Sequence, residues 1–262
     1  MDQAQRDLAY ENGAFIPDAE QYGPRWQADA AAFRARTPCE LDIPYDQHDR
    51  AAYDLFFPQG EAYGLMVFVH GGYWRMRAKS DWSHYASAGL ARGWAVAMIG
   101  YPLAPDIRLS QITRHVAIGI AAAAARVRGP ISLAGHSAGG HLVARMSMPG
   151  VLSDAVAARI LRTVVISGVS DLRPLLDLTM NAELGLDAAE AAAESPVLGP
   201  KHAHIHVTTF VGAEERPVFL DQSRWLAEAW GIKEIILPGR HHFDILDGLE
   251  DPNSLVMREV LG

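Results

Sequence analysis

The chain has 262 residues, of which 49% are hydrophobic and 21% are charged. This is ordinary globular composition, and a chain of this length can bury one large core, so intrinsic disorder is excluded. Lys and Arg number 23 against 31 Asp and Glu, which gives a formal net charge of −8. A net acidic chain without a basic run is a poor ligand for nucleic acid or an anionic membrane, so we expect a small-molecule substrate instead.

Cysteine usage and apolar runs indicate where the protein resides. Cys39 is the single cysteine, so no internal disulfide can form, which suits a reducing compartment. The first residues are charged and lack the apolar core of a signal peptide. The longest wholly apolar run, residues 116–125, is about half of the ~20 residues that a membrane-spanning helix needs. We therefore expect a cytoplasmic protein, and a homodimer is one option that the sequence leaves open.

Short segments rich in aliphatic and β-branched residues recur along the chain and predict β-strands. Most lack a clean apolar–polar alternation, which is typical of strands buried on both faces of a parallel sheet. Helical patterns separate them, and Ser110 is the expected N-cap of one helix. In chain order the predicted elements are an antiparallel edge hairpin (40–44 and 51–57), a strand (65–69), a helix (81–91), a strand (94–99), a helix (112–127), two strands (131–135 and 163–168), a further strand (206–211), a helix (217–230) and a last strand (234–237).

This alternation of strands and helices predicts one α/β domain over residues 1–262, with a mostly parallel twisted sheet flanked by helices. Residues 171–200 interrupt the rhythm, because they are long, mixed in character and bracketed by prolines. We interpret them as a small cap insertion that helps to close a site, with Asn181 as a candidate polar contact to substrate.

The first chemical signal is a G-x-S-x-G motif at residues 135–139, directly after the predicted strand 131–135. In this context Ser137 is expected on a tight strand-to-helix turn, with its hydroxyl exposed at the carboxyl edge of the sheet. The flanking glycines are needed because side chains there would clash with the turn. Ser137 is therefore the candidate nucleophile.

The second signal is the sequence HGGYW at residues 70–74, directly after the predicted strand 65–69. A glycine pair after a strand lets backbone N–H groups turn inward. The N–H groups of Gly71, Gly72 and Tyr73, joined by that of Ala138, are the candidate oxyanion hole.

A serine hydroxyl needs a general base and an acid that orients it. In α/β-hydrolases these follow the nucleophile in the order acid, then histidine. His241 and His242 follow the last predicted strand, and we favour His242 because it adjoins Phe243 and the helix expected there. The acid should follow strand 206–211, where Glu214 and Glu215 both lie, with Asp171 as a weaker alternative.

Alternating histidines form a competing pattern. His202, His204 and His206 would share one face of a strand and could bind zinc. No HExxH motif or carboxylate pattern accompanies them, so a half-exposed strand entry is the better interpretation. His136 and His141 flank the nucleophile and are expected to pack around it or to support the catalytic residues from behind. We expect no cofactor and no metal.

The sequence from His70 to the C-terminus resembles the kynurenine formamidases (arylformamidases) of the α/β-hydrolase fold and their esterase and lipase relatives. The resemblance rests on HGGYW and the residues that follow it to Pro105, on GHSAGGHL at 135–142, on SGVSDLRPLL at 167–176 and on ESP at 194–196. HGGYW is the more specific motif, because broader esterases usually carry HGGG or HGGA. The first sixty residues carry less information.

The resemblance implies a catalytic triad of Ser137, Glu215 and His242. The family acid lies in a segment like D-S-P-E-F-x-x-Q-S, and ERPVFLDQS at 215–223 places Glu215 at that position in preference to Glu214, with Glu in place of Asp. The family histidine precedes Phe and an acidic residue, as His242 does. The implied reaction converts N-formyl-L-kynurenine to L-kynurenine and formate.

An aryl formamide needs a tight acyl side and a flat apolar wall. The candidates for this wall are Tyr73, Trp74, Trp82 and Tyr85, of which Trp82 and Tyr85 are better interpreted as core residues. The alternative with the same chemistry is a carboxylesterase for small aryl or short-acyl esters. A metal-dependent hydrolase that uses the three alternating histidines, and a catalytically silent binding module, are the alternatives from other classes.

Overall fold

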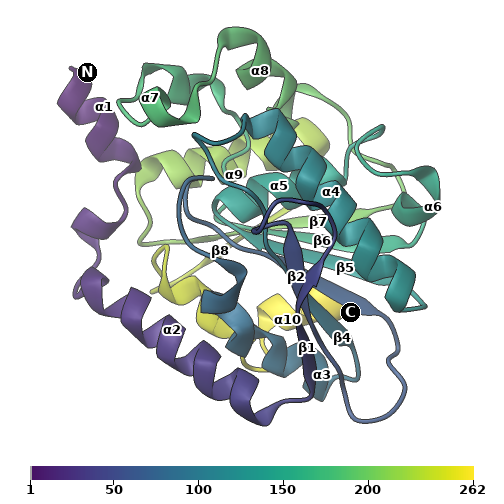
Figure 1. The fold of residues 1–262 in the computed structure, drawn as a ribbon. Helices are drawn as coiled ribbons and strands as arrows, with labels where there is room; N and C mark the ends of the chain where they lie inside the picture. The colour runs from purple at the N-terminus through teal and green to yellow at the C-terminus, as the bar shows by residue number, and fades with distance from the viewer. Residues whose placement is uncertain (1) are drawn as a thin grey trace.

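The computed structural model describes residues 2–262, which form an eight-stranded sheet in the order β1-β2-β4-β3-β5-β6-β7-β8 (Figure 1). The β1–β2 and β2–β4 pairs are antiparallel, and the pairs from β4 to β8 are parallel. The predicted edge hairpin and the mostly parallel sheet are thus confirmed. The strands are β1 (Cys39–Pro44), β2 (Ala52–Phe56), β3 (Leu65–Val69), β4 (Ala95–Ile99), β5 (Ile131–His136), β6 (Ile160–Ile166), β7 (His206–Gly212) and β8 (Lys233–Leu237).

Helices cover both faces of this sheet, which explains why the central strands are apolar on both sides. The helical elements are α1 (Gln3–Tyr10), η1 (Gly13–Phe15), α2 (Ala19–Arg36), η2 (Lys79–Ala86), α3 (Ser87–Ala91), α4 (Leu109–Arg126), α5 (Ala138–Met146), α6 (Asp154–Ala157), η3 (Arg173–Asp177), α7 (Asn181–Leu184), α8 (Ala188–Ala193), η4 (Pro196–Leu198), α9 (Pro217–Trp230), η5 (Asp244–Leu249) and α10 (Leu255–Leu261).

The sheet separates two hydrophobic cores, and strand β3 contributes side chains to both. Leu65, Val67 and Val69 join the core under α4, α5 and α9, whereas Met66 and Phe68 join the core under α2, η2 and α10. The two cores are the physical reason for the unbroken apolar runs in the sequence. In the described part of the chain, no helix is both long enough and apolar enough to cross a membrane.

Several predicted boundaries are wrong. Arg108, not Ser110, is the N-cap of α4, and the Ser110 hydroxyl instead donates a hydrogen bond to Glu190 at 2.6 Å. The predicted helix 81–91 is a 3₁₀ helix followed by a short α-helix. The strand expected at 163–168 runs from Ile160 to Ile166.

Residues 171–200 form a series of short helices beside the carboxyl edge of the sheet, next to the N-terminal helix α1 (Figure 1). The series is joined to α1 at Thr179, whose backbone N–H and hydroxyl donate to Asp7 at 2.8 and 2.6 Å. Asn181 is not a substrate contact as predicted, because its side chain caps its own turn through Leu186 and does not line the pocket at this edge.

Candidate active site

Ser137 lies between the end of β5 and the start of α5, near the centre of the sheet. Its backbone has φ 55° and ψ −116°, a conformation that residues with side chains rarely adopt. The close turn needs Gly139, because a Cβ at that position would lie 1.9 Å from the carbonyl oxygen of Val69. The G-x-S-x-G sequence therefore folds into the expected sharp turn, and Ser137, although only 3% exposed, lines a pocket at this edge of the sheet.

A buried histidine–carboxylate pair lies beside this serine. His242 Nδ1 is 2.6 Å from Glu215 Oε2, and the two residues are 3% and 7% exposed. The second carboxylate oxygen of Glu215 accepts hydrogen bonds from the Ser167 hydroxyl at 2.5 Å and from the Gly212 N–H at 2.8 Å. These donors hold the carboxylate in one orientation, with Oε2 facing His242 Nδ1 as a fixed hydrogen-bond acceptor.

Two aromatic neighbours fix the His242 ring. Phe219 lies with its ring centroid 4.4 Å from that of His242, and His136 lies at 4.6 Å. Burial holds the pKa of His136 well below its usual value, so this imidazole is neutral and its Nε2–H donates to the His242 carbonyl at 2.8 Å. Of the two expected roles, His136 therefore has the supporting one, because it contacts both the ring and the carbonyl of His242.

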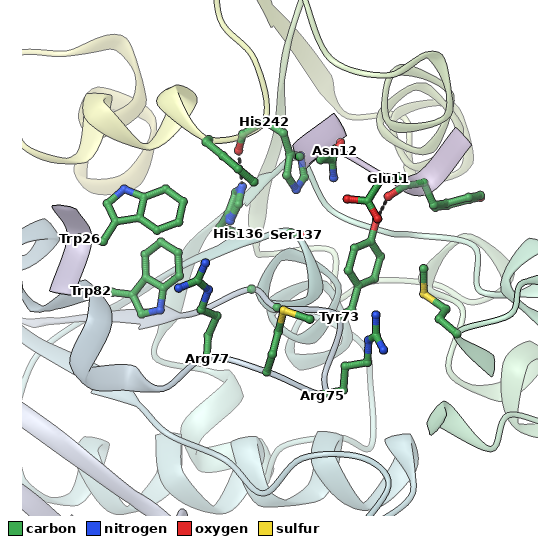
Figure 2. A pocket seen from close by; sticks show the side chains of 17 residues that line it. Glu11, Asn12, Trp26, Tyr73, Arg75, Arg77, Trp82, His136, Ser137 and His242 are labelled. Atoms are coloured by element: carbon green, nitrogen blue, oxygen red, sulfur yellow. Dashed lines mark hydrogen bonds between the residues drawn. The ribbon is translucent and has the colours of Figure 1, made fainter. Parts of the chain in front are cut away.

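Ser137 and His242 line the same pocket, but within residues 2–262 no hydrogen bond joins the serine hydroxyl to the imidazole. Catalytic hydrogen bonds commonly tighten only when substrate is bound. What the fold supplies before binding is the oriented imidazole and the serine, both in the lining of one pocket (Figure 2).

Backbone N–H groups are free at this edge of the sheet. None of the N–H groups of Gly71, Gly72, Tyr73 and Ala138 donates to another backbone group in the described chain. Ala138 is the first residue of α5, where a helix leaves its N–H groups unpaired and favours negative charge. The HGGYW loop and this helix start are therefore equipped to bind an oxyanion.

The pocket has a volume of about 180 Å³ and is lined by segments that lie far apart in sequence. Its lining residues are Tyr10, Glu11, Asn12, Gly13, Trp26, Gly71, Gly72, Tyr73, Arg75, Met76, Arg77, Trp82, His136, Ser137, Met180, His242 and Phe243. Met180 comes from residues 171–200, so this segment contributes to the wall. The volume is below the range of about 300–1,000 Å³ typical of drug-sized ligands, which favours a compact substrate.

The predicted aromatic wall needs correction. Tyr73 lines the pocket, and its hydroxyl donates to the Tyr10 carbonyl at 2.5 Å. Trp74 does not line it: the side chain is 0% exposed and its Nε1–H donates to His141 Nδ1 at 3.3 Å. Positive φ values at both Tyr73 and Trp74 turn the chain so that successive side chains diverge. Trp82 is both a core residue and part of the pocket wall, whereas Tyr85 is buried and does not line the pocket.

The candidate residues for the base and for the acid differ in their surroundings. His241 is turned toward α2 and contacts the Tyr22 hydroxyl at 3.2 Å, whereas His242 faces the pocket. Glu214 is exposed to solvent, and only its neighbour Glu215 contacts an imidazole. Asp171 forms an ion pair with Arg173 instead.

The three alternating histidines do not share a strand face, because β7 begins only at His206. His204 is within hydrogen-bond distance of the Ala157 carbonyl, and His206 lies 3.5 Å from Glu259. Across residues 2–262, no group of His, Cys, Asp or Glu is arranged to hold a metal ion.

Sequence reasoning missed the N-terminal contribution to the site. Tyr10, Asn12 and Trp26 line the pocket from α1, the turn after it and α2. Asn12 is 6% exposed, and its Oδ1 has no hydrogen-bond partner in the described chain. Ser167 was also missed as a partner of the acid, although it lies in a segment that resembles the formamidases.

Comparison with known proteins places the chain among hydrolases. Residues 53–223 match the BD-FAE family. Kynurenine formamidase from Danio rerio is 28% identical over 244 residues (87% of this chain and 83% of that protein), and the enzyme from Drosophila melanogaster is 31% identical over 215 residues (74% and 71%).

Solved structures agree on the fold. A protein from Silicibacter sp. tm1040, provisionally described as a thioesterase, superposes with a TM-score of 0.96 at 49% identity, covering 98% of both chains. A thermostable carboxylesterase from a metagenomic library has a TM-score of 0.71 at 16% identity, covering 93% and 96% of the two chains, and shares the fold alone. The chain therefore has the α/β-hydrolase fold, is homologous to kynurenine formamidases and belongs to the BD-FAE family.

Proposed function

We propose that the protein is a serine hydrolase that cleaves an aryl formamide, N-formyl-L-kynurenine, to L-kynurenine and formate. The observation that carries the proposal is the His242–Glu215 pair, buried beside Ser137 in one small pocket with unpaired backbone N–H groups. The similarity to kynurenine formamidases supports the choice of this substrate.

In the proposed reaction, the Ser137 hydroxyl oxygen attacks the formyl carbon while His242 Nε2 takes the hydroxyl proton. The N–H groups of Gly72, Tyr73 and Ala138 hold the oxyanion that develops, which is worth about 2.7–4 kcal/mol of barrier for each donor. Glu215 stabilises the imidazolium without being protonated.

The tetrahedral intermediate then collapses. Its C–N bond breaks, and the imidazolium returns its proton to the departing aryl amine. Water, deprotonated by the same imidazole, next attacks the formyl-serine ester and releases formate, which restores the Ser137 hydroxyl. A formyl group is the smallest acyl group and suits a pocket of about 180 Å³.

The test compares kcat/KM of the purified protein on N-formyl-L-kynurenine and on p-nitrophenyl acetate, with Ser137→Ala as control. A preference for the formamide of about 100-fold, about 2.7 kcal/mol of transition-state discrimination, supports the proposal. Equal or better hydrolysis of the acetate would instead favour a carboxylesterase for small esters. Labelling of Ser137 by a fluorophosphonate without turnover of either substrate would keep the serine mechanism and reject this substrate class.

A further inference from the structure

Arg77 places a guanidinium group in the wall of the Ser137 pocket. It lies on the loop between β3 and η2 that also carries the candidate oxyanion donors. Its Cγ is 3.1 Å from where a Cβ on Gly72 would stand, so the side chain passes directly beside that glycine. Figure 2 shows the guanidinium rising toward His136 beside the Trp82 indole.

The Arg77 guanidinium packs against helix α2. The Arg77 Cζ lies 5.6 Å from the centre of a Trp26 ring. Gly23, one turn earlier on α2, leaves the space the group occupies, because a Cβ there would lie 2.9 Å from Arg77 Nη1. The backbone of Arg77 has φ 74°, and its carbonyl accepts a hydrogen bond from the Arg50 guanidinium, so the residue is held at this position.

No carboxylate neutralises this charge. In the part of the chain that the structure describes, the Arg77 guanidinium has no ion pair and no hydrogen bond to a protein acceptor. The cations on either side of it in the sequence are different: Arg75 is paired with Glu183, and Lys79, the first residue of η2, is paired with Asp54. A half-buried cation without a partner is costly, and it becomes favourable when a ligand supplies the anion.

We propose that Arg77 is the receptor for an anionic group of the substrate, so that the site selects aryl formamides that carry a carboxylate. This inference rests on the proposed function and assigns the α-carboxylate of N-formyl-L-kynurenine to Arg77. The guanidinium presents a planar fork of N–H donors that matches a carboxylate. In this arrangement the formyl oxygen binds the Gly72 and Tyr73 N–H groups. The part of the substrate that carries the α-carboxylate then extends past Gly72, along the aliphatic carbons of the Arg77 side chain.

The experiment compares two substrates that share the formamide-bearing ring and the ketone. N-formyl-L-kynurenine also carries an α-carboxylate and an α-ammonium, whereas 2-formamidoacetophenone carries neither charged group; a guanidinium can bind only the carboxylate of the two. Arg77→Met, which keeps an unbranched apolar stem, is expected to lower kcat/KM on the charged substrate about 10- to 100-fold, mainly through KM, as expected for a lost charged hydrogen bond. On the neutral substrate the loss should stay below about threefold, because no carboxylate contact is removed.

Arg25→Met is the matched control. Its guanidinium also lies over an aromatic ring of α2, 4.5 Å from the centre of Tyr22, but it does not line the pocket. This control should leave the preference between the two substrates unchanged. Equal losses on both substrates in Arg77→Met would reduce Arg77 to a structural role and overturn the proposal, as would no loss on either.

A binding measurement separates this inference from the proposed reaction. L-kynurenine and the neutral 2-aminoacetophenone are compared as competitive inhibitors of p-nitrophenyl acetate hydrolysis. If the wild-type protein cleaves no formamide, the proposed function fails. Even then, Arg77 is supported as an anion receptor if L-kynurenine inhibits more tightly than 2-aminoacetophenone and this difference disappears in Arg77→Met. Equal inhibition by the two compounds in the wild type refutes it.

Discussion

Shortening the acid by one methylene tests whether a glutamate is required at position 215. The substitution Glu215→Asp withdraws the carboxylate by about 1.3 Å, so the 2.6 Å contact with His242 Nδ1 lengthens to about 3.9 Å, beyond hydrogen-bond range. At an effective dielectric constant of about 20, the attraction between unit charges falls from about 6.4 to about 4.3 kcal/mol over that change. The imidazolium that forms during acyl transfer therefore loses about 2 kcal/mol, and kcat should fall about 30-fold.

The assay is steady-state hydrolysis of N-formyl-L-kynurenine and of p-nitrophenyl acetate at constant pH, with far-ultraviolet circular dichroism to verify folding. Glu214→Asp, the same change on the exposed neighbour, is the matched control and should keep wild-type kcat. Because Ser167 and Gly212 also bind the Glu215 carboxylate, the shorter side chain cannot satisfy all three partners without backbone movement. A folded Glu215→Asp protein with wild-type kcat on both substrates would refute the reasoning.

Three further predictions follow from the same geometry. Ser167→Ala removes one donor to Glu215 and should lower kcat about 10-fold with little change in KM, in the same steady-state assay. Gly139→Ala would place a Cβ 1.9 Å from a neighbouring carbonyl oxygen, so urea denaturation should show a loss of at least about 3 kcal/mol of stability, or no soluble protein. Burial lowers the pKa of His70 to about 3, so the unfolded chain binds an extra proton as pH falls below about 6.5, and the free energy of unfolding should decrease by up to about 1.4 kcal/mol per pH unit on account of this residue. Urea denaturation between pH 7.5 and 5 should show a shallower pH slope for His70→Phe than for the wild type; equal slopes would contradict this assignment.

The strand core and the turn at Ser137 were predictable because each depends on local sequence. Buried parallel strands read as apolar runs, and the turn between β5 and α5 needs glycine within two residues of the serine. The chain order of acid and histidine after the nucleophile then limited the candidates for the base to His241 and His242. It favoured Glu214 and Glu215 over Asp171 for the acid. Choosing His242 over His241 depended on the residue that follows it, and choosing Glu215 over Glu214 depended on the resemblance. Their catalytic roles stay predictions, although the structure brings these two residues into contact.

The pocket wall was predicted less well, because its contacts join distant segments. Trp74 is adjacent to Tyr73 in sequence, but the positive φ values of both residues direct its side chain into the core against His141. Asn181 is polar and lies in residues 171–200, but it satisfies its own turn, and the neighbouring Met180 reaches the pocket instead. Trp26 lies on a helix whose sequence includes a proline and gave no usable pattern.

The wrong predictions about the site concern the residues that shape the pocket rather than the residues proposed to break the bond. The groups proposed to break the bond lie at the ends of β3, β5 and β7 and on the turn after β8, where the sheet fixes their positions. The groups that shape the pocket come from α1, α2 and residues 171–200. Helix α1 is joined to residues 171–200 through Asp7 and Thr179, and to the oxyanion loop through Tyr10 and Tyr73. A hydrolase sheet alone would leave its serine at an open edge. Here the added segments enclose a cavity of about 180 Å³ around it, with Trp26 beside the unpaired Arg77, so we expect changes in these segments to alter which acyl compound is cleaved before they alter the ability to cleave one.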